Sequence, residues 1–586
     1  MMMHSFLGKN LETLEKLNSP IPDWLASTGD LYAKTDRSII KNRWGLPDWQ
    51  LAPGRGLFEG MHPAACYREW IPQKNPATGA TVIIGCNLGY GLNQVLKNSP
   101  DSHRILLIEP RPEMMAACLS QTDYGSFLEM KKLILLPPDL DLFHRTVFQH
   151  LKLQYEFGSI DFRSDLPSRQ LGDEYTDLSK RCKGVMEDFS IEMNTFRLHH
   201  EAMIRNELNN FPRALQDGSL NHLKNMGKGM TAVMLSSGPS LERFAPVLGK
   251  QTGKALYISA FQTLPALQDT GMKPHVAMVI DFQASMMGIL DRLDRSWARD
   301  IPLIYSCKVN PELVEKYPGP TLPLWTVGGL GPRLWQGSEL VLNTGRNVGV
   351  ALLRFLIWCG IDRMLLVGQD FGWSGCKTHS SGHISADRAF RFDPDRHVKL
   401  MNKFGETYYS APVYLAALKA LETELAASNV TAYNLYGGHA VIRGAREVSE
   451  EDLCHGNLLR SEAESLNRFI GLLRQDHKVD SLPRFEAKSR EWSTSLRSAQ
   501  KHLEKLFKKP DTRQQEIRTA FHQLLVFIGQ DTVYQPYLTP EIRNLTGQMF
   551  GKAKFGLKDM AHCRQALKRV KRKVREMDRV LAPNLS

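Results

Sequence analysis

Strand-like and helix-like segments alternate between residues 229 and 440, and this alternation constrains the fold more than any other feature of the sequence. Short apolar runs of strand length recur there, with helical patterns between most of them, at 232–235, 255–259, 276–280, 303–305, 322–327 and 364–367. Because a helix that joins two strands usually returns the chain to a parallel neighbour, the pattern predicts an α/β fold with a doubly wound, mostly parallel sheet.

The chain has 586 residues, whereas single cores rarely grow beyond roughly 250–300 residues. We therefore expect several domains. Changes in composition and in the strand and helix patterns divide the chain into five predicted regions. They are 1–75 (an irregular N-terminal segment rich in Trp and Pro), 76–190 (a Rossmann-like domain), 191–228 (a helical linker), 229–440 (the central α/β domain) and 441–586 (a helical C-terminal domain). The Rossmann-like prediction depends on two strand patterns, 81–84 and 105–108, separated by a glycine turn and a helix.

The composition predicts a cytoplasmic protein. The nine cysteines are scattered and never spaced Cys-x-x-Cys, which argues against a disulfide framework and a structural zinc site. No basic run followed by an apolar stretch opens the chain, and no window is apolar enough to span a membrane. The formal net charge of +12 favours anionic partners without saying which anion.

In open parallel sheets, ligands bind beyond the carboxyl ends of the strands. The turn that follows the run 232–235 contains Gly238, which permits close approach of the backbone, and Pro239, which suits a first helical turn. Ser240 adds a hydroxyl beside free amide groups at a helix N-terminus, and such a terminus is a ready site for phosphate.

Three more segments of this kind follow. Asp281 ends the run 276–280, and Gly-Gln-Asp-Phe-Gly at 368–372 ends the run 364–367. The stretch 343–349 supplies a helix cap and a second group of backbone donors. Each segment alone is common, but all of them fall at strand ends or helix starts of one sheet, which predicts an anion site there.

These segments resemble the motility-associated-factor (Maf) glycosyltransferases of flagellated bacteria, on the stretches 235–241, 271–281 and 344–372. The stretch 344–371 is also similar to bacterial sialyltransferases that use CMP-sialic acid. The resemblance implies that 229–440 is a catalytic, glycosyltransferase-like domain. It also implies transfer of a nonulosonic acid of the pseudaminic or legionaminic type from a CMP-activated donor to Ser or Thr of flagellin, in support of flagellum assembly and motility.

The resemblance assigns the donor site. Gly238, Pro239 and Ser240 would hold the phosphate or ribose of CMP, and Asp281 and Asn347 would lie near the nucleotide. Thr344, Gly345 and Gln369 would complete the donor turns, and Asp370 would order the pocket.

His379 would be the general base toward the acceptor hydroxyl, and His383, four residues on, is a rival for that role. The ordinary imidazole pKa near 6.5 suits this work at neutral pH. Two residues depart from the related patterns. Arg346 replaces a small residue and either reaches the donor carboxylate or points to solvent, and Ser237 stands where the sialyltransferases have Asn.

No metal ion and no further cofactor are expected. A CMP-sugar has a single phosphate, so it needs less charge neutralisation than a UDP- or GDP-sugar. The Asp-x-Asp matches, at 139–141 and 393–395, do not follow the strands that carry the glycine turns. Flagellin and the CMP-nonulosonic acid are the expected partners, and nucleic acid is not.

Two other enzymatic functions stay open. The glycine turn at 85–91, with Glu109 about 20 residues after it, imitates the fingerprint of a methyltransferase that binds S-adenosylmethionine. Archaeal-type 6-hydroxymethylpterin pyrophosphokinases, which use ATP and Mg²⁺, share the Gly-Pro-Ser turn and the strand-end Asp. A scaffold without enzymatic activity leaves the strand-end residues unexplained. The basic stretch 564–579 is interpreted as a solvated helix or a docking surface for an acceptor protein.

Overall fold

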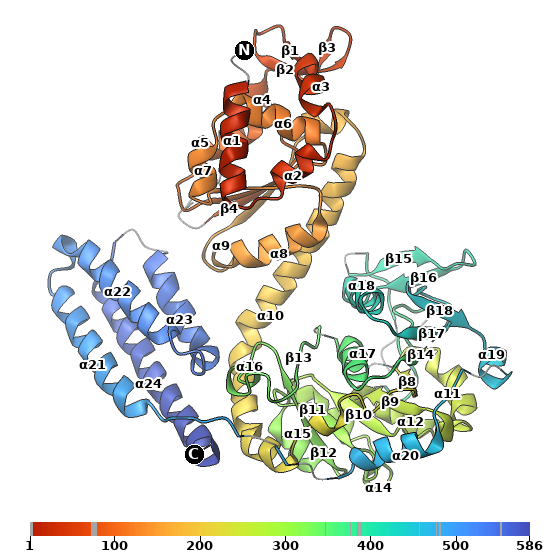
Figure 1. Cartoon of the computed structure of the whole chain (residues 1–586). Coiled ribbons are helices and arrows are strands. Elements are labelled where there is room, and N and C mark those ends of the chain that lie inside the picture. The colour runs from red at the N-terminus through yellow and green to blue at the C-terminus, as the bar shows by residue number, and fades with distance from the viewer. Residues whose placement is uncertain are drawn as a thin grey trace. The chain divides into compact units, whose positions relative to one another are not determined.

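The structure is a computed structural model of the chain (Figure 1). It describes residues 4–71, 79–345, 347–375, 377–383, 386, 390–394, 396–455, 458–475, 478–479, 482–550 and 554–585. The chain forms two compact units, which are described separately. The N-terminal unit comprises Met1–Leu198, Leu506–His522 and Arg543–Met560, and the central unit comprises His199–Lys505, Gln523–Ile542 and Ala561–Ser586.

The N-terminal unit is built around a four-stranded parallel sheet in the order β6-β5-β4-β7. Its strands are β4 (Ala80–Ile84), β5 (Arg104–Ile108), β6 (Leu133–Leu136) and β7 (Ile160–Ser164). Its helices after β4 are α5 (Tyr90–Lys97), α6 (Pro112–Gln121), α7 (Gly125–Glu129), α8 (Leu140–His150) and α9 (Lys152–Phe157). The Rossmann-like prediction is confirmed, and both strands predicted for it are present.

The prediction that residues 1–75 are irregular is wrong. This segment forms α1 (His4–Lys16), α2 (Ile21–Ala26), α3 (Leu31–Ser38), α4 (Pro63–Cys66) and the antiparallel sheet of β1 (Ile39–Lys41), β2 (Pro47–Ala52) and β3 (Arg55–Gly56). Leu14 and Ile21 are buried in one apolar cluster with Ile83 and Leu107 of the parallel sheet. The segment is therefore held by the core of the Rossmann-like domain.

Helix α10 (Glu174–Asp217) runs without interruption across residue 190, where the sequence predicted a domain limit. Its C-terminal part belongs to the central unit. There the Asn210 side-chain amide donates to the carbonyl oxygens of Cys307 and Val309, at 2.9 Å each. This part of α10 is thus fastened to the loop that follows a strand of the central sheet.

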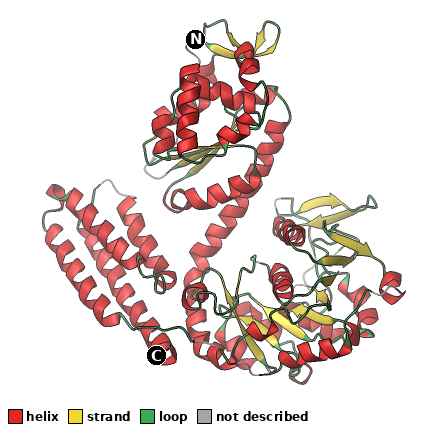
Figure 2. Cartoon of the chain, in the orientation of Figure 1, coloured by secondary structure: helices red, strands yellow, loops and turns green. Residues whose placement is uncertain are grey.

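The central unit contains a nine-stranded, wholly parallel sheet with the order β13-β12-β11-β10-β9-β8-β14-β17-β18. Its strands are β8 (Thr231–Leu235), β9 (Leu256–Ala260), β10 (Val276–Val279), β11 (Leu303–Ser306), β12 (Thr321–Thr326), β13 (Val341–Leu342), β14 (Arg363–Val367), β17 (Thr431–Leu435) and β18 (Ala445–Val448). Its interleaved helices are α11 (Leu241–Gly249), α12 (Leu264–Asp269), α13 (Met287–Leu290), α14 (Arg295–Ala298), α15 (Pro311–Lys316), α16 (Gly331–Leu334), α17 (Val348–Trp358) and α18 (Pro412–Ala427). Figure 2 shows the strands lying among these helices.

This arrangement confirms the doubly wound sheet, and every strand predicted for it is present. The predicted limit at residue 440 falls before β18, which still belongs to the sheet. The strand order reverses at β8, which pairs with β9 on one side and with β14 on the other. Leu235 and Val367 end these two strands in register. The segments after β8 and β14 therefore start side by side at the topological switch point, where ligands of such sheets bind.

A two-stranded antiparallel hairpin of β15 (Val398–Met401) and β16 (Thr407–Ser410) precedes α18. Beyond the sheet the described residues are helical, as predicted. These helices are α19 (Glu450–His455), α20 (Ala463–Leu472), α21 (Ser489–Leu506), α22 (Gln514–Gly529), α23 (Gln535–Phe550) and α24 (Leu557–Leu585). Across the part of the chain that the structure describes, no helix combines the length and the apolar character needed to cross a membrane.

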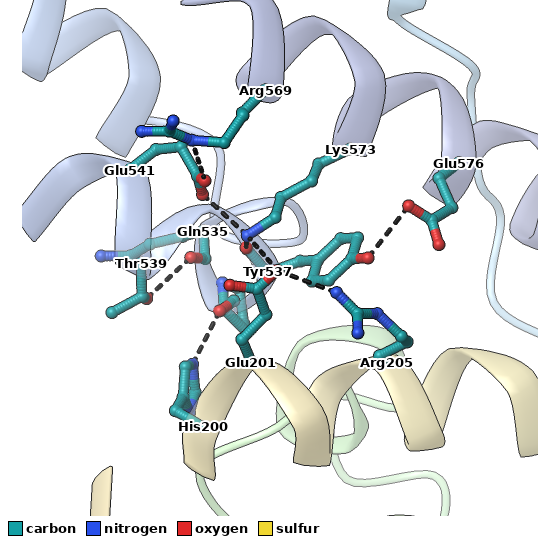
Figure 3. Close-up of polar contacts among 11 residues, drawn as sticks. His200, Glu201, Arg205, Gln535, Tyr537, Thr539, Glu541, Arg569, Lys573 and Glu576 are labelled. Carbon is teal, nitrogen blue, oxygen red and sulfur yellow. Dashed lines mark hydrogen bonds and ion pairs between the residues drawn. The ribbon is translucent and has the colours of Figure 1, made fainter. Parts of the chain in front are cut away.

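The interpretation of the basic stretch as a solvated helix is wrong at Lys573, which is fully buried. Its ammonium lies 2.8 Å from a carboxylate oxygen of Glu541 and 3.2 Å from one of Glu201, and it donates to the Tyr537 carbonyl oxygen at 3.1 Å (Figure 3). Arg569 also contacts Glu541. A buried cation is tolerated only with such partners, and those partners come from distant parts of the sequence.

Candidate functional site

Two glycine turns meet at the switch point. The Gly238 amide donates to the Gly368 carbonyl oxygen at 3.0 Å. A Cβ atom on Gly238 would lie 2.4 Å from that oxygen and 2.4 Å from Asp370 Oδ2, and one on Gly368 would lie 2.1 Å from the Ser236 carbonyl oxygen. The close contact between the turns therefore requires glycine at both positions, and it places the amide-rich start of α11 beside the end of β14.

Asp370 fixes this arrangement from within the protein. Its side chain is 4% exposed, and Oδ2 accepts a hydrogen bond from the Ser240 amide at 2.8 Å. Oδ1 lies 3.9 Å from Nδ1 of His439. The Asp370 carbonyl oxygen accepts from the Ala440 amide. The carboxylate thus ties the end of β14 to the first turn of α11 and to the loop after β17.

Two side-chain amides complete the polar wall. Asn347 caps α17, and its Oδ1 accepts from the amides of Gly349 at 2.7 Å and Val350 at 3.4 Å. Gln369 donates from Nε2 to Ser236 Oγ at 2.5 Å. Both oxygen and nitrogen atoms of these amides thus have defined orientations, set by the elements that flank the switch point.

A pocket of about 380 Å³ opens in front of these groups. Six residues of the predicted site line it: Gly238, Asn347, Gln369, Asp370, His379 and His383. The rest of its lining is Ser236, Ser237, Ala260, Gln262, Thr263, Met286, Ile289, Val348, Gly349, Gly368, Phe371, Gly372, Trp373, Thr378, Tyr414 and Ala417. The combination of an apolar wall with a few converging polar groups is typical of a small-molecule site.

His379 and His383 stack in this pocket. Their rings are nearly parallel, with an interplanar angle of 8° and centroids 4.1 Å apart. His379 Nδ1 lies 3.0 Å from Thr378 Oγ1, and Nε2 lies 3.4 Å from the Tyr414 hydroxyl. The loop is held to the β8 turn, because the Ser380 amide donates to the Ser237 carbonyl oxygen at 2.9 Å. His379 is therefore held in the same pocket as the glycine turns.

Burial lowers the pKa of both imidazoles. The pKa of His379 lies below its ordinary value because of burial alone. The pKa of His383 falls to about 3, because burial is reinforced by the neighbouring His379 and Arg292. Both rings are consequently neutral at physiological pH, and a neutral imidazole can accept a proton.

Other predicted site residues lie outside the pocket lining. Ser240 directly precedes α11, and its buried hydroxyl lies 2.7 Å from the position that a Cβ on Gly437 would take. Asp281 follows β10 and accepts from the Gln283 amide at 2.9 Å. Pro239, Thr344 and Gly345 are not among the lining residues either. Arg346 lies outside the described residues, so its predicted role stays a prediction.

Several lining residues were missed by the sequence reasoning. Gln262 and Thr263 follow β9, so the strand-end rule that found the other turns could have found them. No local sequence pattern indicated that Trp373 and Tyr414 line one site. The hairpin of β15 and β16 separates them in sequence and brings them together in space. His439, which contacts Asp370 and is not among the lining residues, was missed because β17 was not predicted.

The glycine turn of the N-terminal unit, in contrast, is filled by the chain itself. A Cβ on Gly91 would lie 2.6 Å from the Trp70 ring, and one on Gly89 would lie 2.5 Å from the Tyr124 hydroxyl. At the end of the adjacent β7, buried Asp165 accepts from the Tyr67 hydroxyl at 2.6 Å. Aromatic side chains thus stand where a nucleoside would approach the turn.

Glu109, the acid expected to bind a ribose, is also engaged internally. Oε1 accepts from the Tyr175 hydroxyl at 2.6 Å and from the Arg111 amide at 3.0 Å, and Oε2 accepts from the Cys86 amide at 2.7 Å. Complete burial raises the pKa of Glu109 to about 7. This carboxyl group serves the packing of the domain and does not face an open site.

A family model matches part of the central unit. Residues 205–375 match the family model described as 6-hydroxymethylpterin diphosphokinase MptE-like. This range contains both glycine turns and the cap of α17, and it ends before His379.

A solved structure matches over nearly the whole chain. It is the structure of MAf glycosyltransferase from Magnetospirillum magneticum AMB-1, at 16% sequence identity and a TM-score of 0.61. The match covers 99% of this chain and 96% of that one. The resemblance to the Maf glycosyltransferases is thereby confirmed at the level of the fold. No curated protein sequence matches the chain.

Proposed function

We propose that this protein is a cytoplasmic glycosyltransferase that moves a nonulosonic acid, of the pseudaminic or legionaminic type, from its CMP-activated form to Ser or Thr of flagellin. The transfer would support flagellum assembly and motility. The observation that carries the proposal is a single pocket in which the strand-end turns, Asn347 and Gln369 face a neutral, half-buried histidine. The shared fold with a glycosyltransferase supports the same assignment.

In the proposed reaction, the oxygen of the acceptor hydroxyl attacks the anomeric carbon of the donor. The bond from that carbon to the phosphate oxygen of CMP breaks, and CMP leaves with the electron pair. His379 accepts the hydroxyl proton. The N-termini of α11 and α17 provide positive dipole ends near the leaving phosphate, which stabilise developing negative charge.

The donor phosphate is expected to need no metal ion. Among the described residues of the pocket lining, Asp370 contributes the one carboxylate, and its Oδ2 is already bound to the Ser240 amide. Asp139, of the first Asp-x-Asp match, caps α8 by accepting from the amides of Asp141 and Leu142. In the second match, Asp395 lies outside the described residues. Metal independence stays part of the proposal and is tested with it.

A pterin diphosphokinase is the second candidate, and the family match to 205–375 is the observation that favours it. It would transfer a diphosphate from ATP and would require Mg²⁺. Carboxylates are the usual protein ligands of Mg²⁺ beside phosphate oxygens. In the part of the lining that the structure describes, the only carboxylate is that of Asp370, whose Oδ2 is already bound. His379, beyond the matched range, has no assigned task in that reaction.

The test is a transfer assay with purified protein, a CMP-nonulosonic acid and flagellin, read by the mass of intact flagellin. We expect a mass increase that persists in excess chelator and disappears in His379→Ala. His502→Ala, which changes an exposed histidine of α21, is the matched control and should transfer normally. Diphosphate transfer from ATP to a pterin, without any modification of flagellin, would overturn the proposal.

A further inference from the structure

The hairpin of β15 and β16 lies next to the pocket lining. The Trp373 amide donates to the Tyr409 carbonyl oxygen at 2.8 Å, and the Tyr409 amide donates to the Trp373 carbonyl oxygen at 2.8 Å. Trp373 lines the pocket, and so does Tyr414, at the start of the helix that follows β16. The segment at Trp373, β16 and β15 therefore form successive strands of one ribbon that begins at the pocket.

The hydrogen-bond pattern fixes which backbone groups of β15 point outward. In antiparallel strands the amide and carbonyl of one residue point to the same side, and the side alternates along the strand. Because Tyr409 bonds to Trp373, its neighbours Tyr408 and Ser410 face β15, where they pair with Leu400 and Val398. The amides and carbonyls of Lys399 and Met401 must then face away from β16.

Among the described residues, β15 pairs with β16 alone. Met401, on its open edge, is 72% exposed, and Phe404, in the turn that follows, is 68% exposed. Phe392, whose ring contacts Tyr409, is exposed as well. An unpaired strand edge beside exposed apolar side chains is a template for an added strand.

A second copy of this chain is a poor occupant of that edge. If two β15 edges paired antiparallel, Lys399 of each copy would lie near Lys399 of the other, and like charges across a strand pair are destabilising. The two neighbouring cations, Arg396 and Lys403, are in ion pairs with Asp393 and Glu447, so the repulsion comes from Lys399. The edge therefore suits a different, non-cationic chain.

We propose that the outer edge of β15 binds an extended, non-cationic segment of the acceptor polypeptide, with apolar side chains at alternate positions, as an added strand. The proposal rests on the proposed function, which supplies a protein acceptor. An added strand lies three strand spacings, roughly 14 Å, from the segment at Trp373, and about five extended residues span that distance. The modified hydroxyl then lies a few residues along the acceptor from the docked segment.

The test compares Lys399→Pro with Lys399→Ala. Proline removes the outward amide without removing a hydrogen bond to β16, whereas alanine retains that amide. With flagellin as the probe, we expect Lys399→Pro to lower kcat/KM for transfer at least tenfold and Lys399→Ala to lower it less than threefold. Hydrolysis of the donor by water should be equal in both. Equal effects of the two variants on transfer, whether large or absent, would overturn the docking proposal.

Hydrogen exchange on the wild-type protein covers two remaining cases. If Lys399→Pro unfolds, or if the wild type does not modify flagellin, exchange at the amides of Lys399 and Met401 still reports on docking. Slower exchange at both amides on addition of flagellin supports the added strand, and unchanged exchange contradicts it. If the wild type does not modify flagellin, the proposed function is wrong, whatever the exchange experiment shows about docking.

Discussion

The two parallel sheets of this protein carry similar sequence signals and differ in what covers them. Both have a glycine turn after a central strand at the point where the strand order reverses. In the N-terminal unit that turn faces Trp70 and Tyr124, whereas in the central unit it faces a pocket of about 380 Å³. A glycine turn thus indicates only that something approaches closely, and here that is a side chain in one sheet and an open pocket in the other.

Buried polar atoms lie near both glycine turns. In the N-terminal unit, Glu109 and Asp165 accept hydrogen bonds from side chains and amides around them. Around the pocket, Thr263 Oγ1, Ser240 Oγ, Trp373 Nε1 and His439 Nδ1 are buried without a hydrogen-bond partner. Unsatisfied buried groups cost stability and are uncommon, but the N-terminal unit has them as well, among them Asn87 Oδ1 and Ser168 Oγ near its glycine turn. These groups therefore do not distinguish the two sheets.

The largest expected effect is on chemistry in the central unit. His379→Ala should lower the rate of transfer by about 10²–10⁴-fold, the usual contribution of a general base. CMP binding should persist, because the glycine turns and Asn347 are untouched. Steady-state rates together with a CMP thermal shift separate these two outcomes. If His383→Ala abolishes transfer while His379→Ala does not, the rival histidine is the base.

The next effect concerns the turn itself. In Gly238→Ala the new Cβ would lie 2.4 Å from two oxygen atoms, so the turns must separate and the pocket must change shape. We expect CMP affinity to fall at least tenfold, or about 1.4 kcal/mol, by calorimetry. Gly253→Ala is the matched control, because a Cβ there meets nothing within 4 Å. Equal CMP affinity in both variants would remove the β8 turn from the donor site.

The corresponding change in the N-terminal unit should affect stability alone. Tyr67→Phe removes a hydrogen bond to buried Asp165, which should cost about 1–3 kcal/mol in urea unfolding. CMP affinity should not change. Tyr90→Phe, which removes a bond to the uncharged Pro47 carbonyl oxygen, should cost less. Loss of CMP binding in Tyr67→Phe alone would show that the two sheets do not have separate roles.

The smallest effect is the dependence on pH. Because the pKa of His379 is lowered in the folded protein, the acid limb of kcat/KM should lie below pH 6.5, the ordinary imidazole pKa. The pKa of His383 is about 3 in the folded protein and near 6.5 in the unfolded chain, so the unfolded chain binds a proton first as the pH falls. The contribution of His383 to stability is therefore complete above pH 6.5 and is lost progressively down to pH 3. A pH profile of rate and one of unfolding midpoint check both limbs.

Much of this architecture could be predicted from the sequence, since it depends on local signals. The apolar runs located the strands from β8 to β12 and β14, and the turns after β8 and β14 marked the switch point. Strands β17 and β18 carry polar and half-buried residues, so their pattern did not indicate a strand.

The rest depended on long-range contacts that no local pattern contains. Trp70 and Tyr67 fill the first glycine turn only because the N-terminal segment folds onto the Rossmann-like core. Lys573 belongs to a run of cations, yet it is buried against Glu541 and Glu201 (Figure 3). Tyr414 reaches His379 after an intervening hairpin.

The most direct test of the account is hydrogen exchange of the full-length protein with CMP, and in parallel with S-adenosylmethionine and with ATP plus Mg²⁺. The account predicts that CMP alone slows exchange in the segments 236–241 and 368–371, and that no ligand protects 85–91. Protection of 85–91 by S-adenosylmethionine, or protection of the central turns by ATP with Mg²⁺ and not by CMP, would contradict it.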